Sequence, residues 1–113
     1  MQIKATGFEG LVEIIPPVFH DERGWFYQVY KETAFQEKGI SLRFVQENQS
    51  FSKKNVVRGL HMQTSPYGQA KLVTVLKGKA LDVVVDLRPG SPTFSKVFYC
   101  LLDGNVHNMM MIP

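Results

Sequence analysis

Residues 71–87, "KLVTVLKGKALDVVVDL", consist of two β-prone runs separated by Lys77-Gly78-Lys79. A glycine between two runs rich in Val and Leu is typical of a tight β-hairpin. We therefore expect antiparallel strands at Lys71–Leu76 and Ala80–Leu87, joined by that turn.

The rest of the chain repeats this pattern of short apolar runs divided by Gly, Pro, Asn and Asp. Many short strands at close spacing favour an all-β sandwich or barrel over alternating β-α units. Only "KETAFQEK" predicts a helix, which ends at Gly39. We expect the helix at Lys31–Lys38 and further strands at Leu11–Ile15, Trp25–Tyr30, Leu42–Phe51, Val56–Gln63 and Lys96–Leu102.

The two faces of each predicted strand can be compared, because successive side chains point to opposite sides. Asp82 shares its face with small apolar residues, while the opposite face of the same run is wholly apolar. Gln46 shares a face with Asn48, and His61 with Gln63. A solvated face would be more uniformly polar. The pattern predicts a barrel whose inner cavity is lined in part by polar side chains. Its outer face would be covered by a second sheet or by another subunit.

Two positions in "NVVRGLHMQ", residues 55–63, need a local irregularity to act together. Arg58 and His61 are three residues apart, so a regular strand would point them to opposite faces. Gly59 lies between them, where a β-bulge costs least, and a bulge there would turn both side chains toward one cavity.

Lys71 and Asp82 come opposite one another if the hairpin turns at Gly78. An acid in an apolar strand needs a partner when it is buried, so a cross-strand pair is expected. Sequence alone leaves two interpretations open, a plain salt bridge and a pair with a role in a site.

The stretch "HDERGWF" combines an acidic turn with Arg23 and aromatic residues. It fits a solvated loop that leads into a strand. It also fits a phosphate site, because a guanidinium group matches phosphate oxygens and the aromatic rings can stack on a base.

Composition narrows the class of protein. At 113 residues the chain forms one domain, 1–113, and its net charge of +3 suits a small anion but is too weak and dispersed for nucleic acid. No run reaches the about 18 apolar residues of a membrane span.

Cys100 is the only cysteine, so we expect a buried, unreactive thiol and a reducing cytoplasm. A cupin metal site is not expected, because no His-x-His pair occurs.

Five motifs occur together: "FHDERGWFYQVY", "FVQENQSFS", "VVRGLHMQ", "GQAKLVTVLKGKALDVVVDLRPGSPTF" and the closing "MMMIP". In order and spacing they resemble the dTDP-4-dehydrorhamnose 3,5-epimerase family, which has the RmlC-like cupin fold. The resemblance runs from near the N-terminus to Pro113. It implies a cupin-type jelly roll, a homodimer, and cofactor-free epimerisation of a dTDP-4-keto-6-deoxy sugar in dTDP-rhamnose biosynthesis.

The resemblance also implies roles for individual residues. His61 would be the base that removes a proton next to the C4 ketone, and Lys71 would stabilise the enolate oxygen. This chemistry needs a group that titrates near neutral pH and a cation at the oxyanion, which these two side chains provide. Asp82 is the third catalytic candidate. The candidate substrate contacts are Arg23 and Arg58 on the diphosphate, Phe26 near the nucleotide, Gln46 and Asn48 on the nucleotide sugar, and Gln28 and Gln63.

Some positions depart from the family. It often has Glu at Gln28, His at Gln49 and Arg at Phe51. It also continues beyond the position of Pro113 into a Gly-Phe-Ala-His-Gly-Phe segment, a tyrosine acid and an aspartate that orients the base. We therefore expect a jelly roll truncated at its C-terminus, the N-terminal part of an epimerase.

Three alternatives to this interpretation stay open. The first is an epimerase that acts at C3 only or at C5 only. The second is a truncated nucleotide-sugar-binding protein without activity, and the third is a purely structural β-sandwich.

Overall fold

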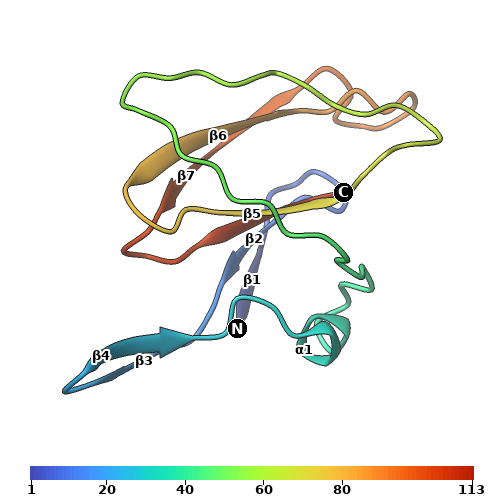
Figure 1. Cartoon of the computed structure of the whole chain (residues 1–113). Helices are drawn as coiled ribbons and strands as arrows, with labels where there is room; N and C mark the ends of the chain where they lie inside the picture. The colour runs from blue at the N-terminus through green and yellow to red at the C-terminus, as the bar shows by residue number, and fades with distance from the viewer.

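The computed structural model describes residues 1–113, in eight strands and one short helix. Four of the strands form one sheet in the order β1-β2-β8-β5, and the others pair as two hairpins, β3–β4 and β6–β7 (Figure 1). The expected all-β class with one helix is confirmed. The bounds are β1 Gln2–Ala5, β2 Val12–Ile15, β3 Val18–Asp21, β4 Gly24–Tyr27, α1 Glu32–Gln36, β5 Lys71–Thr74, β6 Lys79–Val85, β7 Val97–Asp103 and β8 Met109–Ile112.

Three consecutive methionines in β8 form the centre of the main sheet. β8 pairs antiparallel with β2 on one side and β5 on the other. Met109 and Met111 belong to a buried cluster with Ile14, whereas Met110 belongs to a second cluster with Leu102. Because side chains alternate along a strand, these two clusters cover the two faces of the sheet.

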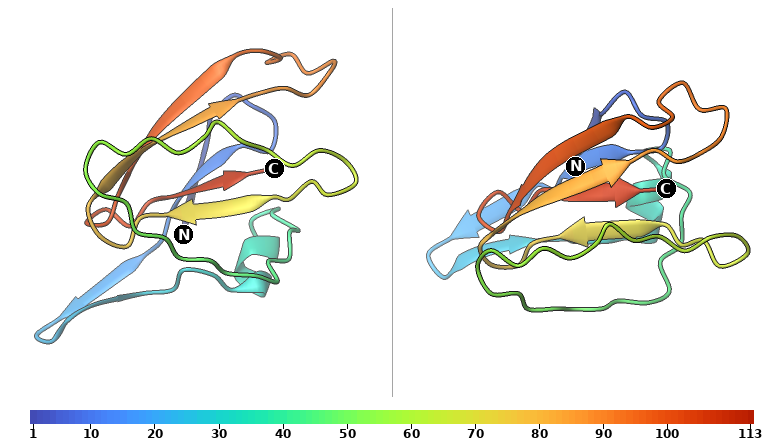
Figure 2. Two further views of the ribbon diagram at one scale, coloured as in Figure 1. Left: turned by 45° about the horizontal axis from the view of Figure 1, so that its top comes forward. Right: turned by 90° about the horizontal axis from the view of Figure 1, so that it is seen from above.

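The β6–β7 hairpin supplies much of the second cluster. Val84 and Phe98, one from each strand, pack against Leu102 and Met110, so the face of β6 that carries Asp82 is turned toward the main sheet. The left view of Figure 2 shows the hairpin and the main sheet as separate layers. The opposite face of the hairpin carries large apolar side chains that no other part of the chain covers, namely Leu81, Val97, Tyr99 and Leu101.

The helix and the first hairpin flank the sheet. Phe35 anchors α1 because it is only 2% exposed and packs edge-on against Tyr30 at 5.0 Å. Gly39 follows the helix with φ +79°, a left-handed conformation that ends helices and suits glycine. The β3–β4 hairpin projects from the body of the molecule in Figure 1.

Two expected strands are wrong. Leu42–Phe51 and Val56–Gln63 lie in a long irregular segment, residues 41–70, that passes in front of β5 and β6 in Figure 1. Val45, Phe51 and Val57 are 84% exposed or more. A β-prone run forms a strand only where a neighbouring strand accepts its hydrogen bonds, and no strand of this structure pairs with the segment. Gly59 therefore lies in a loop, and the predicted bulge is absent.

The hairpin expected at Gly78 is also wrong, although Lys77-Gly78-Lys79 does form a turn. β5 pairs with β8, and β6 pairs with β7, so the two runs that flank the turn belong to different sheets. Gly104 explains part of this arrangement, because its amide donates to the Gly78 carbonyl at 3.0 Å and ties the turn to the end of β7.

A network centred on Asp86 fixes the loop after β6. The side chain of Asp86 accepts hydrogen bonds from the hydroxyls of Ser91 and Thr93, each at 2.6 Å. It also accepts from the Arg88 guanidinium, whose remaining nitrogen donates to the Glu9 carbonyl at 2.9 Å. The loop is thereby joined to the turn that precedes β2. No helix in the structure has the length and apolarity needed to cross a bilayer.

Candidate functional site

Lys71 lies on β5 of the main sheet, and Asp82 lies on β6, on the face of the β6–β7 hairpin that is turned toward that sheet. Both side chains are half-buried. Burial raises the pKa of Asp82, and the backbone amide of Val83 and the positive charge of Lys71 lower it in part. The sequence predicted a cross-strand pair, and this is corrected, because β5 and β6 do not pair. The charges interact across two layers instead.

The surroundings of Asp82 are apolar and confined. Cys100 lies directly opposite Asp82 on β7, and it is 8% exposed. Burial raises the pKa of the Cys100 thiol, and the carboxylates of Glu13 and Asp82 raise it further. The thiol is therefore protonated at neutral pH and unreactive, as expected. Asp82 Oδ2 is buried and has no hydrogen-bond partner within the chain.

An unpaired buried carboxylate oxygen is costly unless something else binds to it. Lys71 and Asp82 form no salt bridge. The role of the pair in a functional site stays a prediction.

His61 lies on the 41–70 segment and is exposed. Its side chain packs against Gly59, whose φ is +107°. A Cβ atom added to Gly59 would lie 3.0 Å from His61 Nδ1. Only glycine at this position therefore allows the imidazole ring to keep its present position. No contact joins His61 to Lys71. Gln63 lies on the same loop and is exposed.

Arg58 and the pair Gln46–Asn48 lie on the same segment. The guanidinium of Arg58 donates to Ser52 Oγ at 2.9 Å and to the Phe51 carbonyl at 3.0 Å, which holds it across its own loop. Gln46 Nε2 donates to Asn48 Oδ1 at 3.1 Å. Gln46 and Asn48 therefore lie next to each other, as predicted, although the strand that was expected to hold them is absent.

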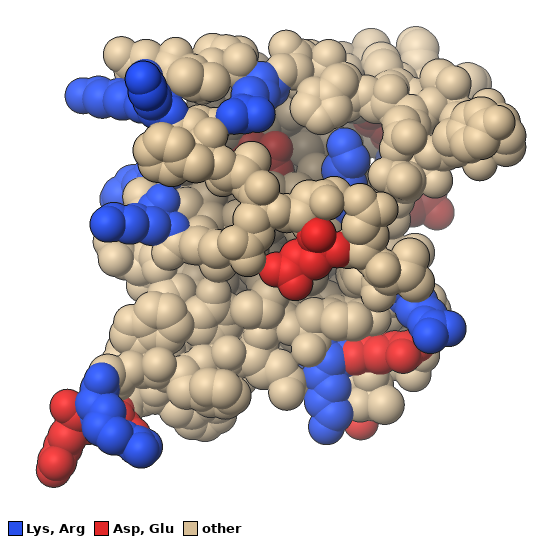
Figure 3. Space-filling model, viewed as in Figure 1, with Lys and Arg blue, Asp and Glu red and all other residues tan.

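Arg23 and Phe26 lie on the β3–β4 hairpin, and Gln28 follows it. Arg23 donates to both carboxylate oxygens of Asp21, through its backbone amide at 2.9 Å and its guanidinium at 2.6 Å. This contact lowers the pKa of Asp21. Acidic and basic side chains meet at the hairpin tip, at the lower left of Figure 3. An open depression of about 360 Å³ at the tip is lined by Phe19, His20, Asp21, Arg23, Gly24, Trp25 and Phe26.

The structure therefore divides the predicted residues into three groups. Lys71 lies on β5 and Asp82 on β6, the loop residues lie on the 41–70 segment, and the hairpin residues lie on or just after the β3–β4 hairpin, which projects from the other end of the molecule (Figure 1). No cluster of three or more His, Cys, Asp or Glu side chains could hold a metal ion.

Sequence reasoning missed two features. The first is the Asp21–Arg23 contact, which the spacing Asp-x-Arg at a tight turn could have suggested. The second is an aromatic stack in which His107 lies against Trp25 and Tyr27, with ring centroids 4.4 and 4.5 Å away. No local sequence pattern indicates that stack, because its members are about 80 residues apart in the chain.

Comparison with known proteins gives a consistent result. A profile of the dTDP-4-dehydrorhamnose 3,5-epimerase family matches residues 5–113. The Escherichia coli K12 dTDP-4-dehydrorhamnose 3,5-epimerase is 41% identical over 114 residues, which cover 100% of this chain and 62% of that protein. A dTDP-4-dehydrorhamnose 3-epimerase from Streptomyces niveus is 47% identical over 95 residues, covering 83% of this chain and 46% of the relative.

A solved structure gives the same result in three dimensions. The Legionella pneumophila epimerase in complex with dTDP-4-keto-L-rhamnose superimposes with a TM-score of 0.93 at 44% identity. The match covers 99% of this chain and 60% of that one. The chain therefore spans less than two thirds of the length of the relatives it matches.

Proposed function

The chain belongs to the dTDP-4-dehydrorhamnose 3,5-epimerase family and has its RmlC-like cupin fold, and from this we propose that it epimerises a dTDP-linked 4-keto-6-deoxy sugar. The observation that carries the proposal is that the charge of half-buried Lys71 reaches the carboxyl of Asp82, whose buried Oδ2 has no partner in the chain. A cation held in an apolar interior is what a developing enolate requires.

The proposed reaction begins with removal of a proton. His61 takes a proton from the carbon next to the C4 ketone, and the electrons of the broken C–H bond form the enolate, with its charge on the C4 oxygen. Lys71 stabilises that oxygen by charge and hydrogen bonding. A proton that comes from solvent adds to the opposite face of the carbon and inverts the centre, and His61 then releases its proton to solvent. No electrons leave the substrate, so the reaction itself requires no redox cofactor.

Asp82 is proposed to position Lys71 rather than to transfer a proton. Its negative charge acts on the ammonium group from the adjacent layer, and burial between the layers strengthens this attraction. His61 and Lys71 have no contact in the structure, so the proposed site requires the 41–70 loop to bring the imidazole to the substrate.

The remaining predicted residues are proposed to bind the substrate. Arg58 and Arg23 are assigned to the diphosphate, because a guanidinium group donates two parallel hydrogen bonds to phosphate oxygens. The aromatic ring of Phe26 is 66% exposed, which leaves it free to stack on a base. Gln46, Asn48, Gln63 and Gln28 are assigned to the polar groups of the nucleotide sugar.

The test is deuterium exchange. The protein is incubated with dTDP-4-keto-6-deoxyglucose in D2O, and the C3 and C5 protons are followed by NMR. Deuterium at both carbons supports a 3,5-epimerase. The absence of exchange together with measurable dTDP binding would refute the enzymatic proposal and leave a nucleotide-sugar-binding protein.

A second candidate function has one specific observation behind it. The Streptomyces niveus relative is a 3-epimerase, and its 47% identity exceeds that of the 3,5-epimerase from Escherichia coli. Deuterium at C3 alone in the same experiment would favour a single-centre enzyme. The 3,5-epimerase stays our first proposal, because the family profile carries that description over residues 5–113.

We further propose that the protein forms a homodimer in the cytoplasm. The uncovered apolar face of the β6–β7 hairpin, with Leu81 and Tyr99 each more than 60% exposed, supports a partner surface. A single free cysteine, Cys100, supports a reducing compartment. Sedimentation of the wild type against Leu81→Lys tests the dimer, which the lysine should weaken.

A further inference from the structure

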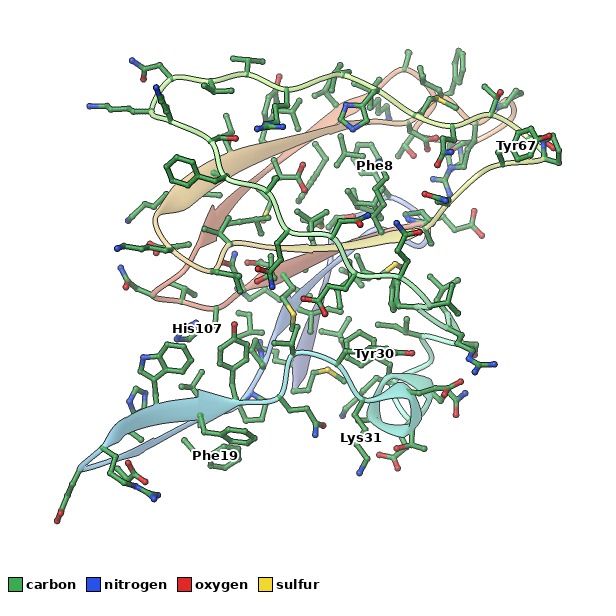
Figure 4. All side chains as sticks on the ribbon, viewed as in Figure 1. Phe8, Phe19, Tyr30, Lys31, Tyr67 and His107 are labelled. Carbon is green, nitrogen blue, oxygen red and sulfur yellow. The ribbon has the colours of Figure 1, made fainter.

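His107 holds the β3–β4 hairpin against the body of the molecule. Its ring stacks on Tyr27 with an interplanar angle of 29° and lies against Trp25 at 4.4 Å. Figure 4 shows His107 between the hairpin and the turn that joins β7 to β8. The backbone of His107 has φ +59°, a left-handed conformation that is uncommon outside glycine.

The imidazole of His107 borders an open space. The residue as a whole is only 5% exposed, and its backbone amide donates to the Asp103 carbonyl at 2.9 Å. The ring lines a depression of about 300 Å³. An imidazole always has at least one nitrogen that can donate, so His107 brings a hydrogen-bond donor to the edge of that depression.

The chemistry of that depression favours an anion. No carboxylate lines it. The nearest acid, Asp103, is already held by Lys79 at 2.8 Å and by the amide of Asn105 at 2.9 Å. The lining consists of His20, Trp25, Leu76, Lys77, Gly78, Gly104, Asn105 and His107.

We propose that this depression binds a small oxyanion of the sulfate or phosphate class, between His107, His20 and Lys77. Lys77 supplies a positive charge, and the ammonium and the two imidazole rings supply hydrogen-bond donors to such an ion. A phosphate-sized ion fits easily within the volume. The site lies outside every contact assigned above to the sugar nucleotide.

The geometry of the hairpin keeps the two binding regions apart. His20 pairs with Trp25, and the neighbouring pair is Phe19 with Phe26. Side chains of successive pairs point to opposite faces, and Trp25 meets His107, so Phe26 points away from the anion site. Figure 4 shows Phe19 on the side of the hairpin away from His107. The oxyanion therefore binds on the face of the β3–β4 hairpin that is turned toward His107. Arg23 belongs to the same hairpin.

The charged side chains around the depression are few. Lys77 lines it. Lys79 of the β5–β6 turn pairs with Asp103 of β7 at 2.8 Å, so that pair is neutral as a whole. Lys77 is therefore the cation that is left to attract an ion into the depression.

Sulfate is the first probe, because it keeps its two charges near neutral pH. The protein is titrated with sodium sulfate at constant ionic strength and constant pH, and the imidazole nitrogens are followed by NMR. The ring signals of His107 and His20 should move in a saturable way at millimolar sulfate. Inorganic phosphate should move the same signals.

Three variants and one control decide the proposal. His20→Gln and Lys77→Gln change exposed side chains and should each weaken sulfate binding by about threefold to tenfold. His107→Asn keeps a residue that tolerates positive φ and should abolish saturation. Lys54→Gln removes the same charge from the exposed 41–70 segment and should leave binding unchanged.

Three results would overturn the assignment. The first is the absence of saturable shifts up to about 100 mM sulfate, an affinity too weak for a site. The second is an equal loss of binding in Lys54→Gln. The third is sulfate-dependent shifts confined to the side chains of Arg23 and Arg58. If His107→Asn fails to fold, His20→Gln and Lys77→Gln still decide, because both positions are exposed.

Discussion

Lys71 and Asp82 lie on strands that do not pair with each other, yet the positive charge of Lys71 lowers the pKa of Asp82 in part. Lys71 belongs to the main sheet and Asp82 to the β6–β7 hairpin. Their electrostatic interaction therefore depends on how the two layers are packed.

His61→Ala should lower deuterium exchange at the substrate carbons by at least about 100-fold, because the proposed general base is lost. The affinity for dTDP, measured by calorimetry, should stay within a few-fold. Thr64→Ala, on the same exposed loop, is the matched control and should exchange normally. Full activity in His61→Ala would remove histidine from the role of base.

Lys71→Gln should lower exchange by about 100- to 1000-fold, because the cation at the enolate oxygen is lost. The exposed Lys53→Gln variant carries the same change in charge and should keep its rate. Equal effects of the two substitutions would show that net charge rather than the position of Lys71 matters.

Asp82→Asn should make the protein more stable at neutral pH while it lowers activity. The pKa of Asp82 is raised in the folded state, chiefly by burial, so the folded protein binds this proton more tightly than the unfolded chain does. Wild-type stability therefore falls as pH rises from about 4, the unfolded pKa, through the folded pKa. In thermal unfolding the variant should gain a few degrees at pH 7 and nothing at pH 3. A loss at pH 7 would mean that the attraction to Lys71 outweighs burial.

Arg58→Ala should weaken dTDP binding about tenfold or more, because a charged hydrogen-bond donor to phosphate is removed. The exposed Arg43→Ala variant has no assigned contact and serves as the control. The salt dependence of binding should also become shallower in Arg58→Ala but not in Arg43→Ala. Unchanged affinity in Arg58→Ala would exclude it from the diphosphate site.

Asp86→Asn should lower the melting temperature at neutral pH by about 5 °C or more, because three side chains donate to that carboxylate. Their hydrogen bonds hold the pKa of Asp86 far below its usual value, with Arg88 the largest cause. The stability this contributes is present above the unfolded pKa of about 4 and is lost as pH falls below it. The difference between wild type and variant should therefore shrink from pH 5 to pH 2 in thermal unfolding, and a constant difference would contradict the assignment.

Local pattern was enough to locate several strands and the helix, although it did not identify the partners of the strands. The runs at Leu11–Ile15, Lys71–Leu76, Ala80–Leu87 and Lys96–Leu102 are confirmed as strands, with shorter or shifted bounds. The helix at Lys31–Lys38 is confirmed in its central residues, because an apolar anchor and a terminal glycine are local signals. The family was also readable from the order of short motifs, as the profile over residues 5–113 confirms.

The tertiary structure alone decided which strands pair and which β-prone runs become strands at all. The 41–70 segment has the right residues for strands but no neighbour to accept its hydrogen bonds, and β5 pairs with β8 from the far end of the chain. The environment of Asp82 and the stack around His107 follow from those long-range choices. The physical reason is that side-chain pattern specifies what a strand can bury, whereas pairing depends on which backbone groups are within reach once the layers have packed.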